Sequence, residues 1–573
     1  MKKRITGFLM CSLLLCMSLL AGCSLVDTNY KDYYTQIVAT VEKDGHRYEI
    51  SKRELMYAYQ TTGYQYVQYY GMSKEQAYKQ MLTSLENTKI LVDTAERTFN
   101  ISRDGLNLSE KEKTYLYSEV EDAFEANYEV FYKDIVGEEK SSQEEDTNSV
   151  AITSYTKNAS YNALDKTITR ENKSAKLLSG FSYTYARDIN KNEDKELIYT
   201  NLLQRLHSDE QKKALRDYYR NLKANEYGMG LNTDQKDVFM REIERLYNSV
   251  YETYVCAKYN ESILDDKSTN VTPESIANLY ASKVRAGYTQ YVIERDSNYD
   301  STLTGSVDTM YYFKEGATDN KYFTVANILI KFDETQQKQY DAYTKEYEDA
   351  KDPSLYEDYQ SNIEGVYNTL EPVIRIYNNG TKTYDGEKSK DTSVDEVYSD
   401  ITSRLSRAQA TGDVNKVGDE INKLVYEYNE DPGMLKGGNN YVIGVDKDGN
   451  LISNSFVSSF NDGAIELFNK GNAKVGDVSG YVKTNYGIHI LIYTGECKNL
   501  FEGIDSTFSL SEDAVNVLYT TRVNPLIDKT YFDVMYDEIY SDNTTSYQQA
   551  NLSVLKQDYT IYEYSSRFSD LFK

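Results

Sequence analysis

The stretch "GYVKTNYGIHILIY", residues 480–493, decides the fold class of the C-terminal half of this chain. Apolar and β-branched residues lie on both sides of Asn485-Tyr486-Gly487, a sequence typical of a turn. The stretch therefore predicts two strands joined by a short turn. The second strand contains His489, one of only three histidines among 573 residues.

The elements before this strand pair mix helices with strands. The segment "YFTVANILIKF", residues 322–332, predicts a β-branched apolar strand, and Ser393 with Glu396 forms a capping box that begins a helix. The segment "INKLVYEYNEDPGMLKGGNNYVIGV", residues 421–445, predicts a helix that ends in a loop punctuated by glycine and proline. A short helix that ends at Lys470-Gly471 follows. This order predicts an α+β fold with antiparallel pairing.

The N-terminal half begins with a predicted hairpin and continues as helices. Ile37–Val41 and Arg47–Ile50 flank a turn that contains glycine, and capping boxes then mark three helix starts. These boxes are Ser51 with Glu54, Ser73 with Gln76, and Ser109 with Glu112. Apolar positions recur at helical spacing from Asp234 onward, and Thr272-Pro273 begins another helix. The biased polar composition near residues 138–205 predicts a loop or disordered insertion.

The first 23 residues predict a lipoprotein signal. A basic start is followed by an apolar run that is too short to span a bilayer, and Leu20-Ala21-Gly22-Cys23 closes it. We expect residues 1–22 to be removed, Cys23 to be lipidated, and residues 23–34 to form a tether. The mature chain would then be held at the outer face of the cell membrane by its N-terminal lipid alone.

Charge and cysteine content exclude several classes of partner and site. Removal of residues 1–22 takes away three basic and no acidic residues, so the net charge changes from −26 to −29. This charge repels nucleic acid and anionic headgroups. Cys256 and Cys497 are the only cysteines after Cys23, so we expect neither a disulfide framework nor a metal site.

Five pieces of the C-terminal half resemble, in order, the parvulin-type peptidyl-prolyl isomerases. They are "ILIK", "YNEDPG", Gly437-Gly438, "FNDGAIEL" followed by "VGDVSGYVKT", and "YGIHILI". With its lipoprotein signal and the N-terminal segment "VATVEKDGHRYEISKREL", the chain resembles the foldase lipoproteins of the PrsA type and the chaperones of the SurA type.

That resemblance implies a domain layout. A mostly helical chaperone lobe would be built from residues 35–310, with the polar insertion near 138–205, and from C-terminal helices in residues 496–573. A parvulin-like antiparallel-sheet domain, residues 322–495, would be inserted into this lobe and would carry its own insertion near 333–392.

The resemblance also implies site residues and needs no cofactor. His489 stands at the family's second histidine, Asp431 at its Cys or Asp, and Thr484 at its hydroxyl residue. Asn327 replaces the first histidine; it can donate and accept hydrogen bonds but cannot titrate. The substrate-binding residues would be Phe460 as the seat of the proline ring, with Phe456 as an alternative register and Leu451 where Met is frequent.

Three functions stay open at this point. The first is a foldase that isomerises X-Pro bonds of unfolded or newly exported polypeptides. The second is a holdase chaperone of the same architecture with a degenerate parvulin domain. The third is a solute-binding or adhesive surface lipoprotein, which does not predict the set of His489, Thr484 and Asp431. The oligomeric state also stays open.

Overall fold

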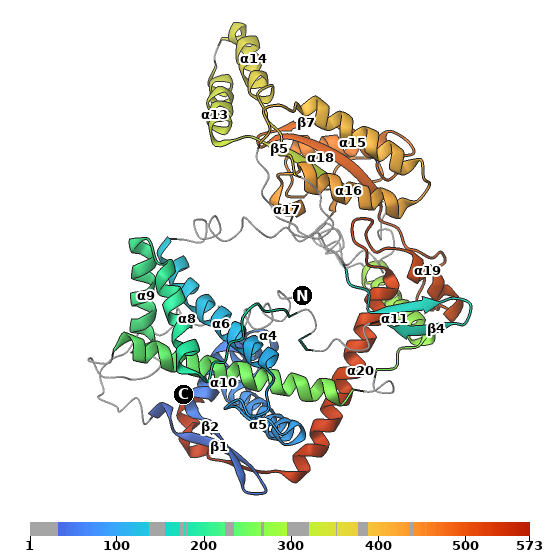
Figure 1. Ribbon diagram of the computed structural model, residues 1–573. Helices are drawn as coiled ribbons and strands as arrows, with labels where there is room; N and C mark the ends of the chain where they lie inside the picture. Colours follow the sequence, from blue (N-terminus) through green and yellow to red (C-terminus); the bar gives the residue numbers. More distant parts are fainter. Residues whose placement is uncertain are drawn as a thin grey trace. The chain divides into compact units, whose positions relative to one another are not determined.

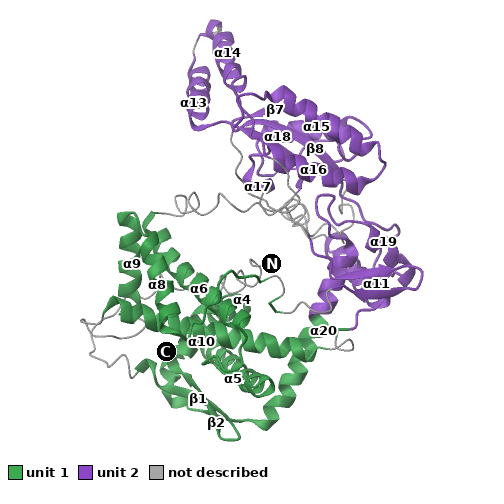
Figure 2. Ribbon diagram, viewed as in Figure 1, with its two compact units in different colours: residues 1–144, 174–269, 542–573 green, residues 145–173, 270–541 purple. Residues whose placement is uncertain are grey.

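The computed structural model describes residues 33–136, 155–171, 177–178, 181–223, 234–264, 269–294, 320–350, 352–375, 388–435, 440–452 and 454–572. The predicted signal segment, Cys23, nearly all of the tether, Gly437-Gly438 and residues 138–154 lie outside these ranges. The described chain is a mixture of helices and small antiparallel sheets. It divides into two compact units, each of which is assembled from separate segments (Figure 2).

Unit 1 comprises residues 1–144, 174–269 and 542–573. Its helices are α3 Lys52–Ala58, α4 Tyr64–Tyr70, α5 Lys74–Phe99, α6 Glu110–Val136, α8 Asn192–Arg205, α9 Asp209–Asn221 and α10 Gln235–Ser262. Its sheet has the order β2-β1-β9, with β1 Ile37–Lys43, β2 His46–Ser51 and β9 Thr560–Glu563. The hairpin of β1 and β2 confirms the sequence prediction, and Asp44 and Gly45 in its turn both have positive φ.

The capping boxes begin helices where the sequence placed them. Ser51 and Ser73 each accept a hydrogen bond from the backbone three residues on, at the starts of α3 and α5. Before α6, the side chains of Ser109 and Glu112 each accept a hydrogen bond from the backbone amide of the other residue.

Two features differ from the prediction. Residues 192–205 of the expected polar insertion form helix α8, whose Ile198 and Leu202 are buried in the helical core. Residues 560–563 form a strand, although helices were expected in the C-terminal segment.

Unit 2 comprises residues 145–173 and 270–541. Its helices are α11 Pro273–Tyr288, α13 Glu334–Asp349, α14 Tyr356–Tyr367, α15 Val394–Gln409, α16 Val414–Tyr428, α17 Pro432–Leu435, α18 Ser458–Asn469 and α19 Val515–Thr520, and α20 Tyr531–Leu555 begins in it. Its strands are β3 Ala159–Asn162, β4 Thr167–Arg170, β5 Lys321–Lys331, β6 Tyr441–Val445, β7 Val478–Thr484 and β8 Gly487–Glu496.

Helix α11 belongs to unit 2, although residues up to 310 were expected in the N-terminal lobe. Its buried side chains, among them Tyr280 and Val284, pack with Val515 and Phe532 in one hydrophobic cluster. Residues 333–392, expected only as an insertion, contain the helix pair α13 and α14. Residues 376–387 of this expected insertion lie outside the described chain.

The four-stranded sheet of unit 2 has the order β6-β5-β8-β7, and every pairing is antiparallel. Helix α18 packs on one face and helices α15 and α16 on the other (Figure 1). Strand β5 is buried from Tyr322 to Ile330, which explains its continuous run of apolar residues. This arrangement confirms the α+β class and the antiparallel pairing.

The glycine in "YGIHILIY" lets β8 lie close to β5. Gly487 has φ +139°, and a Cβ atom there would lie 2.1 Å from the carbonyl oxygen of Ile330. No side chain fits without moving the backbone of one strand. We expect Gly487→Ala to lower the free energy of unfolding of unit 2 by about 2 kcal/mol. The measurement is peroxide oxidation of buried Met434 along a urea series.

Gly480 provides the matched control. It lies on β7, and a Cβ atom there would meet no other atom within 4 Å. Gly480→Ala is expected to change the free energy by less than about 0.5 kcal/mol. Equal effects of the two substitutions would contradict the steric explanation.

Candidate functional site

Four polar residues meet on the face of the sheet that helix α18 covers. Asn327 lies on β5, His489 on β8, Thr484 at the end of β7, and Asp431 in the loop before α17. The register pairs Leu329 with His489, and Asn327 lies two residues before Leu329 on β5, on the same face of the sheet. Only 1 % of Asn327, 4 % of Thr484 and 6 % of His489 is exposed. The strands thus bring together residues that are far apart in the sequence.

These four side chains form one line of hydrogen bonds. Thr484 Oγ1 lies 2.9 Å from His489 Nε2, and His489 Nδ1 lies 3.1 Å from Asn327 Oδ1. Asn327 Nδ2 donates to Asp431 Oδ2 at 2.8 Å. Because the carboxylate takes the amide donor, Asn327 presents its oxygen to His489, which must donate from Nδ1. The imidazole is therefore held as the Nδ1–H tautomer, and its Nε2 accepts from the Thr484 hydroxyl.

Asp431 is held by further groups that the sequence did not single out. Tyr441 OH donates to Asp431 Oδ2 at 2.8 Å, and the Gly433 amide donates to Oδ1 at 2.9 Å. The buried Asn429 accepts from the amides of Leu329 and Asp431, which ties this loop to β5. The only sequence signal for Tyr441 was its place three residues after Gly437-Gly438. Its role follows from the pairing of β6 with β5.

Aromatic side chains pack against His489. The Phe460 ring lies 5.4 Å from the imidazole at an interplanar angle of 83°, with Phe456 5.2 Å from Phe460 and Tyr441 5.0 Å from Phe456. Phe460 is only 3 % exposed, whereas Phe456 and Tyr441 are half-buried. Phe460 therefore supports the imidazole from the core. Among these three aromatic residues, Phe456 and Tyr441 are the ones with surface that a ligand can reach.

Leu451 is set apart from this group. It bridges to Val445, at the opposite end of β6 from Tyr441, and is 38 % exposed. Four residues of strand separate the two ends by about 13 Å. The structure therefore brings together six of the seven residues that the resemblance assigned to the isomerase site, and Leu451 is the exception.

Burial controls the charge of the site. Desolvation lowers the pKa of His489 to about 4, and the negative charge of Asp431 only partly opposes this shift. The imidazole is therefore neutral at pH 7. Burial, together with the neighbouring Asp431, raises the pKa of Tyr441, so its hydroxyl stays protonated and donates.

The lowered pKa predicts a pH dependence of stability. Between pH 4 and 6.5 the unfolded chain binds a proton at His489 that the folded chain does not, so stability falls as the pH falls through this window. Relative to pH 7, this residue should cost about 2 kcal/mol at pH 5. The measurement compares wild type with His489→Gln in urea series read by Met434 oxidation. If the free energy of unfolding of wild type and that of His489→Gln differed by the same amount at pH 7 and at pH 5, the imidazole would titrate normally in the folded protein.

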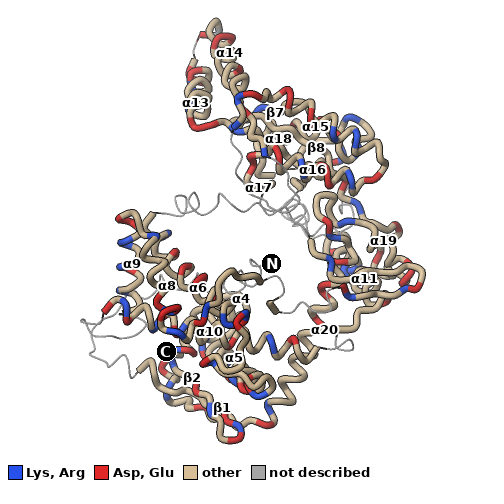
Figure 3. The backbone as a smooth tube through the Cα atoms, viewed as in Figure 1, with Lys and Arg blue, Asp and Glu red and all other residues tan. Residues whose placement is uncertain are grey.

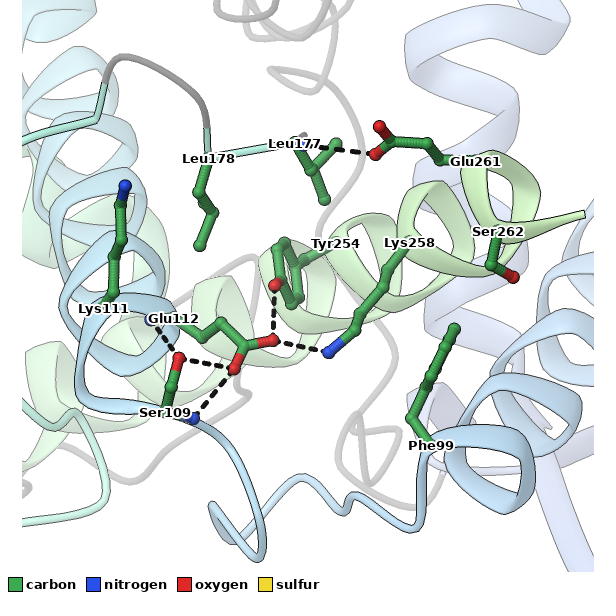
Figure 4. Close-up of a pocket in the computed structure, with 10 residues that line it drawn as sticks. All are labelled: Phe99, Ser109, Lys111, Glu112, Leu177, Leu178, Tyr254, Lys258, Glu261 and Ser262. Carbon is green, nitrogen blue, oxygen red and sulfur yellow. Dashed lines mark hydrogen bonds and ion pairs between the residues drawn. The ribbon is translucent and has the colours of Figure 1, made fainter. Parts of the chain in front are cut away.

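Unit 1 contains a pocket of about 480 Å³ between α5, α6 and α10 (Figure 4). Apolar and aromatic side chains line it, namely Phe99, Leu177, Leu178 and Tyr254. Glu112 is held on one wall by Lys258 Nζ at 2.6 Å and Tyr254 OH at 2.7 Å. Burial alone would raise the pKa of Glu112, but the bonds from Lys258, Ser109 and Tyr254 lower it to about 2. These bonds thus satisfy the Glu112 carboxylate, which lies beside the apolar side chains of the lining.

Comparison with protein-family models, curated proteins and solved structures found no match to this chain. Within the described ranges, no helix is both long and apolar enough to cross a membrane. The same ranges hold no group of three or more His, Cys, Asp or Glu side chains that could bind a metal ion. Acidic residues are spread over both units (Figure 3).

Proposed function

We propose that this chain is a lipid-anchored foldase outside the cytoplasm, in which residues 322–495 are a parvulin-like peptidyl-prolyl isomerase. The observation that carries the proposal is the line of Thr484, His489, Asn327 and Asp431, backed by the aromatic side chains of α18 and β6. A solute-binding or adhesive lipoprotein gives no reason for this arrangement. The substrates would be X-Pro bonds of unfolded, newly exported polypeptides.

Prolyl isomerisation requires this kind of site because no covalent bond to the substrate has to form. The barrier of ~18–20 kcal/mol comes from the loss of amide resonance in the twisted state. A site that binds the twisted amide more tightly than the planar one lowers this barrier. Phe456 and Tyr441 would seat the pyrrolidine ring. The fixed dipoles of the line would stabilise the charge distribution of the twisted amide, as preorganised hydrogen-bonding groups do in other enzymes.

Asn327 determines how the line works. A second histidine at this position could titrate, whereas the amide of Asn327 does not change its charge with pH. The proton of His489 then stays on Nδ1, and the carboxylate of Asp431 accepts from a neutral donor. We therefore assign His489 and Thr484 to contact with the substrate amide, and Asn327 and Asp431 to positioning.

The pocket of unit 1 supports the proposal that this protein also binds unfolded polypeptides as a chaperone. Its apolar lining suits the side chains that an unfolded polypeptide exposes, since their transfer from water is favourable. The same pocket also supports the holdase alternative, in which unfolded chains are bound and the isomerase unit is inactive. Both the foldase and the holdase would bind unfolded chains, and only the foldase would catalyse prolyl isomerisation.

A prolyl tetrapeptide assay separates these alternatives. The protein without residues 1–22 should accelerate cis-to-trans conversion if it is a foldase. A holdase would suppress the aggregation of an unfolded protein and leave the tetrapeptide rate at the uncatalysed value. If neither effect occurs, a solute-binding or adhesive function becomes the better proposal.

The lipid anchor is tested separately. Cys23→Ala is expected to release the full chain from the membrane fraction, because the thiol would be the only attachment point. Fractionation of cells that express wild type and Cys23→Ala provides the measurement. Membrane association that survives the substitution would rule out Cys23 as the anchor.

A further inference from the structure

The helix pair α13 and α14, which lies in the insertion, stands beside the turn that joins β7 to β8. Lys331, the last residue of β5, pairs with Gly487, the first residue of β8, so the chain enters the insertion next to this turn. The two helices then lie at this end of the sheet (Figure 1). Their side chains bond to three successive residues, which are Lys483, Thr484 and Asn485.

Tyr367, the last residue of α14, makes the central bond of these three. Its hydroxyl donates to the backbone carbonyl of Thr484 at 2.8 Å, and both residues are buried. The Tyr367 ring packs in the hydrophobic cluster on the face of the sheet opposite His489, with the Phe332 ring 5.2 Å and the Tyr340 ring 5.8 Å away. Tyr367 therefore reaches the backbone of Thr484 from the far face of the sheet.

Two partly exposed contacts flank this bond. Gln337 Nε2 on α13 donates to the carbonyl of Asn485 at 3.1 Å. On α14, the carboxylate of Glu364 pairs with the ammonium of Lys483. Contacts at exposed positions contribute little to stability, because water competes for the same groups. The buried bond from Tyr367 is therefore the one that we expect to hold the backbone of the turn.

The Thr484 hydroxyl depends on the backbone position of its own residue. Its oxygen accepts from the amide of Tyr486 at 3.1 Å, and its proton points to His489 Nε2 at 2.9 Å. One short side chain has to satisfy both bonds, and χ1 is the only torsion that places its oxygen. A displaced backbone would lengthen or bend at least one of these bonds and so weaken it. A group that holds the Thr484 carbonyl thus also holds the hydroxyl.

We propose that Tyr367 is a positioning residue for the Thr484 hydroxyl, and that the insertion is thereby part of the isomerase site. The inference rests on the proposed function, since it gives the insertion a role in that catalysis. Tyr367 acts through Thr484 and has no direct part in the reaction. An insertion that only decorated the sheet would give no reason for a buried bond to the residue of β7 that bonds to His489.

Tyr367→Phe tests the proposal because it removes the hydroxyl and keeps the ring in its packing. We expect kcat/KM for cis-to-trans conversion of a prolyl tetrapeptide to fall about fivefold, the effect of one hydrogen bond. Tyr398→Phe is the matched control. The Tyr398 hydroxyl on α15 donates to the carbonyl of Ser479 at 2.8 Å, a bond of the same kind near the start of the same strand. Its loss should leave the rate unchanged.

The nitrogen signal of His489 Nε2 separates positioning from a general loss of structure. Solid-state NMR of the protein without residues 1–22, labelled with ¹⁵N in its three histidines, would record this signal. Thr484→Val supplies the reference, because Nε2 then lacks its hydroxyl donor. Tyr367→Phe should move the signal downfield towards this reference, whereas Tyr398→Phe should leave it at the wild-type position.

A wild-type Nε2 signal in Tyr367→Phe, or an equal shift in Tyr398→Phe, would overturn the proposal. The signal requires no catalysis, so its outcome is independent of the isomerase assay. If the wild-type protein left the tetrapeptide rate at its uncatalysed value, the proposed function would fail, and the Nε2 signal would still decide whether Tyr367 positions the hydroxyl.

Discussion

His489→Ala is expected to reduce kcat/KM for cis-to-trans conversion of a prolyl tetrapeptide about a hundredfold, the loss typical for one preorganised group at a reaction centre. The substitution removes the group that links Thr484 to Asn327 and leaves the Thr484 hydroxyl without its acceptor. It also removes the ring on which Phe460 packs edge to face. The measurement is a tetrapeptide assay with the protein at a series of concentrations.

His207→Ala is the matched control for this prediction. His207 is exposed and lies in unit 1, so its loss should leave the tetrapeptide rate unchanged. Circular dichroism and Met434 oxidation would show whether His489→Ala keeps the fold. A folded His489→Ala protein with the wild-type rate would mean that the hydrogen-bonded line has no part in catalysis.

Asn327→Leu is expected to cost about 4 kcal/mol of the free energy of unfolding of unit 2, because it leaves the buried His489 and the half-buried Asp431 short of a partner. Leucine has a similar volume but neither donates nor accepts. His489 Nδ1–H would lose its acceptor, and Asp431 would lose one of its donors, at a position that is 1 % exposed in the native protein. The urea series read by oxidation of Met434 measures the change.

Ile328→Val on the same strand controls for a general disturbance of β5. Ile328 is fully buried on the opposite face, and removal of one methylene should cost about 1 kcal/mol. If Asn327→Leu cost no more than Ile328→Val, Asn327 would be dispensable for the order of the site.

Most of the local structure could be predicted because it depends on neighbouring residues. Ser51, Ser73 and Ser393 cap helices through bonds to residues three positions away, and these pairs are visible in the sequence. The strand at 322–332 was equally clear, since it is buried on both faces and reads as a continuous apolar run. The polar segment that contains α8 misled the prediction because only three apolar or aromatic side chains of this helix, Ile198, Tyr199 and Leu202, are buried.

The candidate site could be predicted only as a set of residues. A resemblance placed Asn327, Asp431, Thr484 and His489 in one cleft, and the structure brings these four side chains within hydrogen-bonding distance of one another in a line. Sequence reasoning missed Tyr441 because its contact with Asp431 depends on the pairing of β6 with β5, which no local pattern shows. The bond from Tyr367 to Thr484 likewise joins two distant elements of the chain.

The most direct test of the central claim is the refolding of a protein whose slow phase is limited by prolyl isomerisation. Such a phase takes tens of seconds without a catalyst, so acceleration is easy to detect. The protein without residues 1–22 is expected to accelerate the phase in proportion to its concentration, and His489→Ala is expected to leave the phase near its uncatalysed rate. A wild-type protein that leaves the slow phase unchanged, at concentrations that prevent aggregation, would contradict the foldase and leave the holdase.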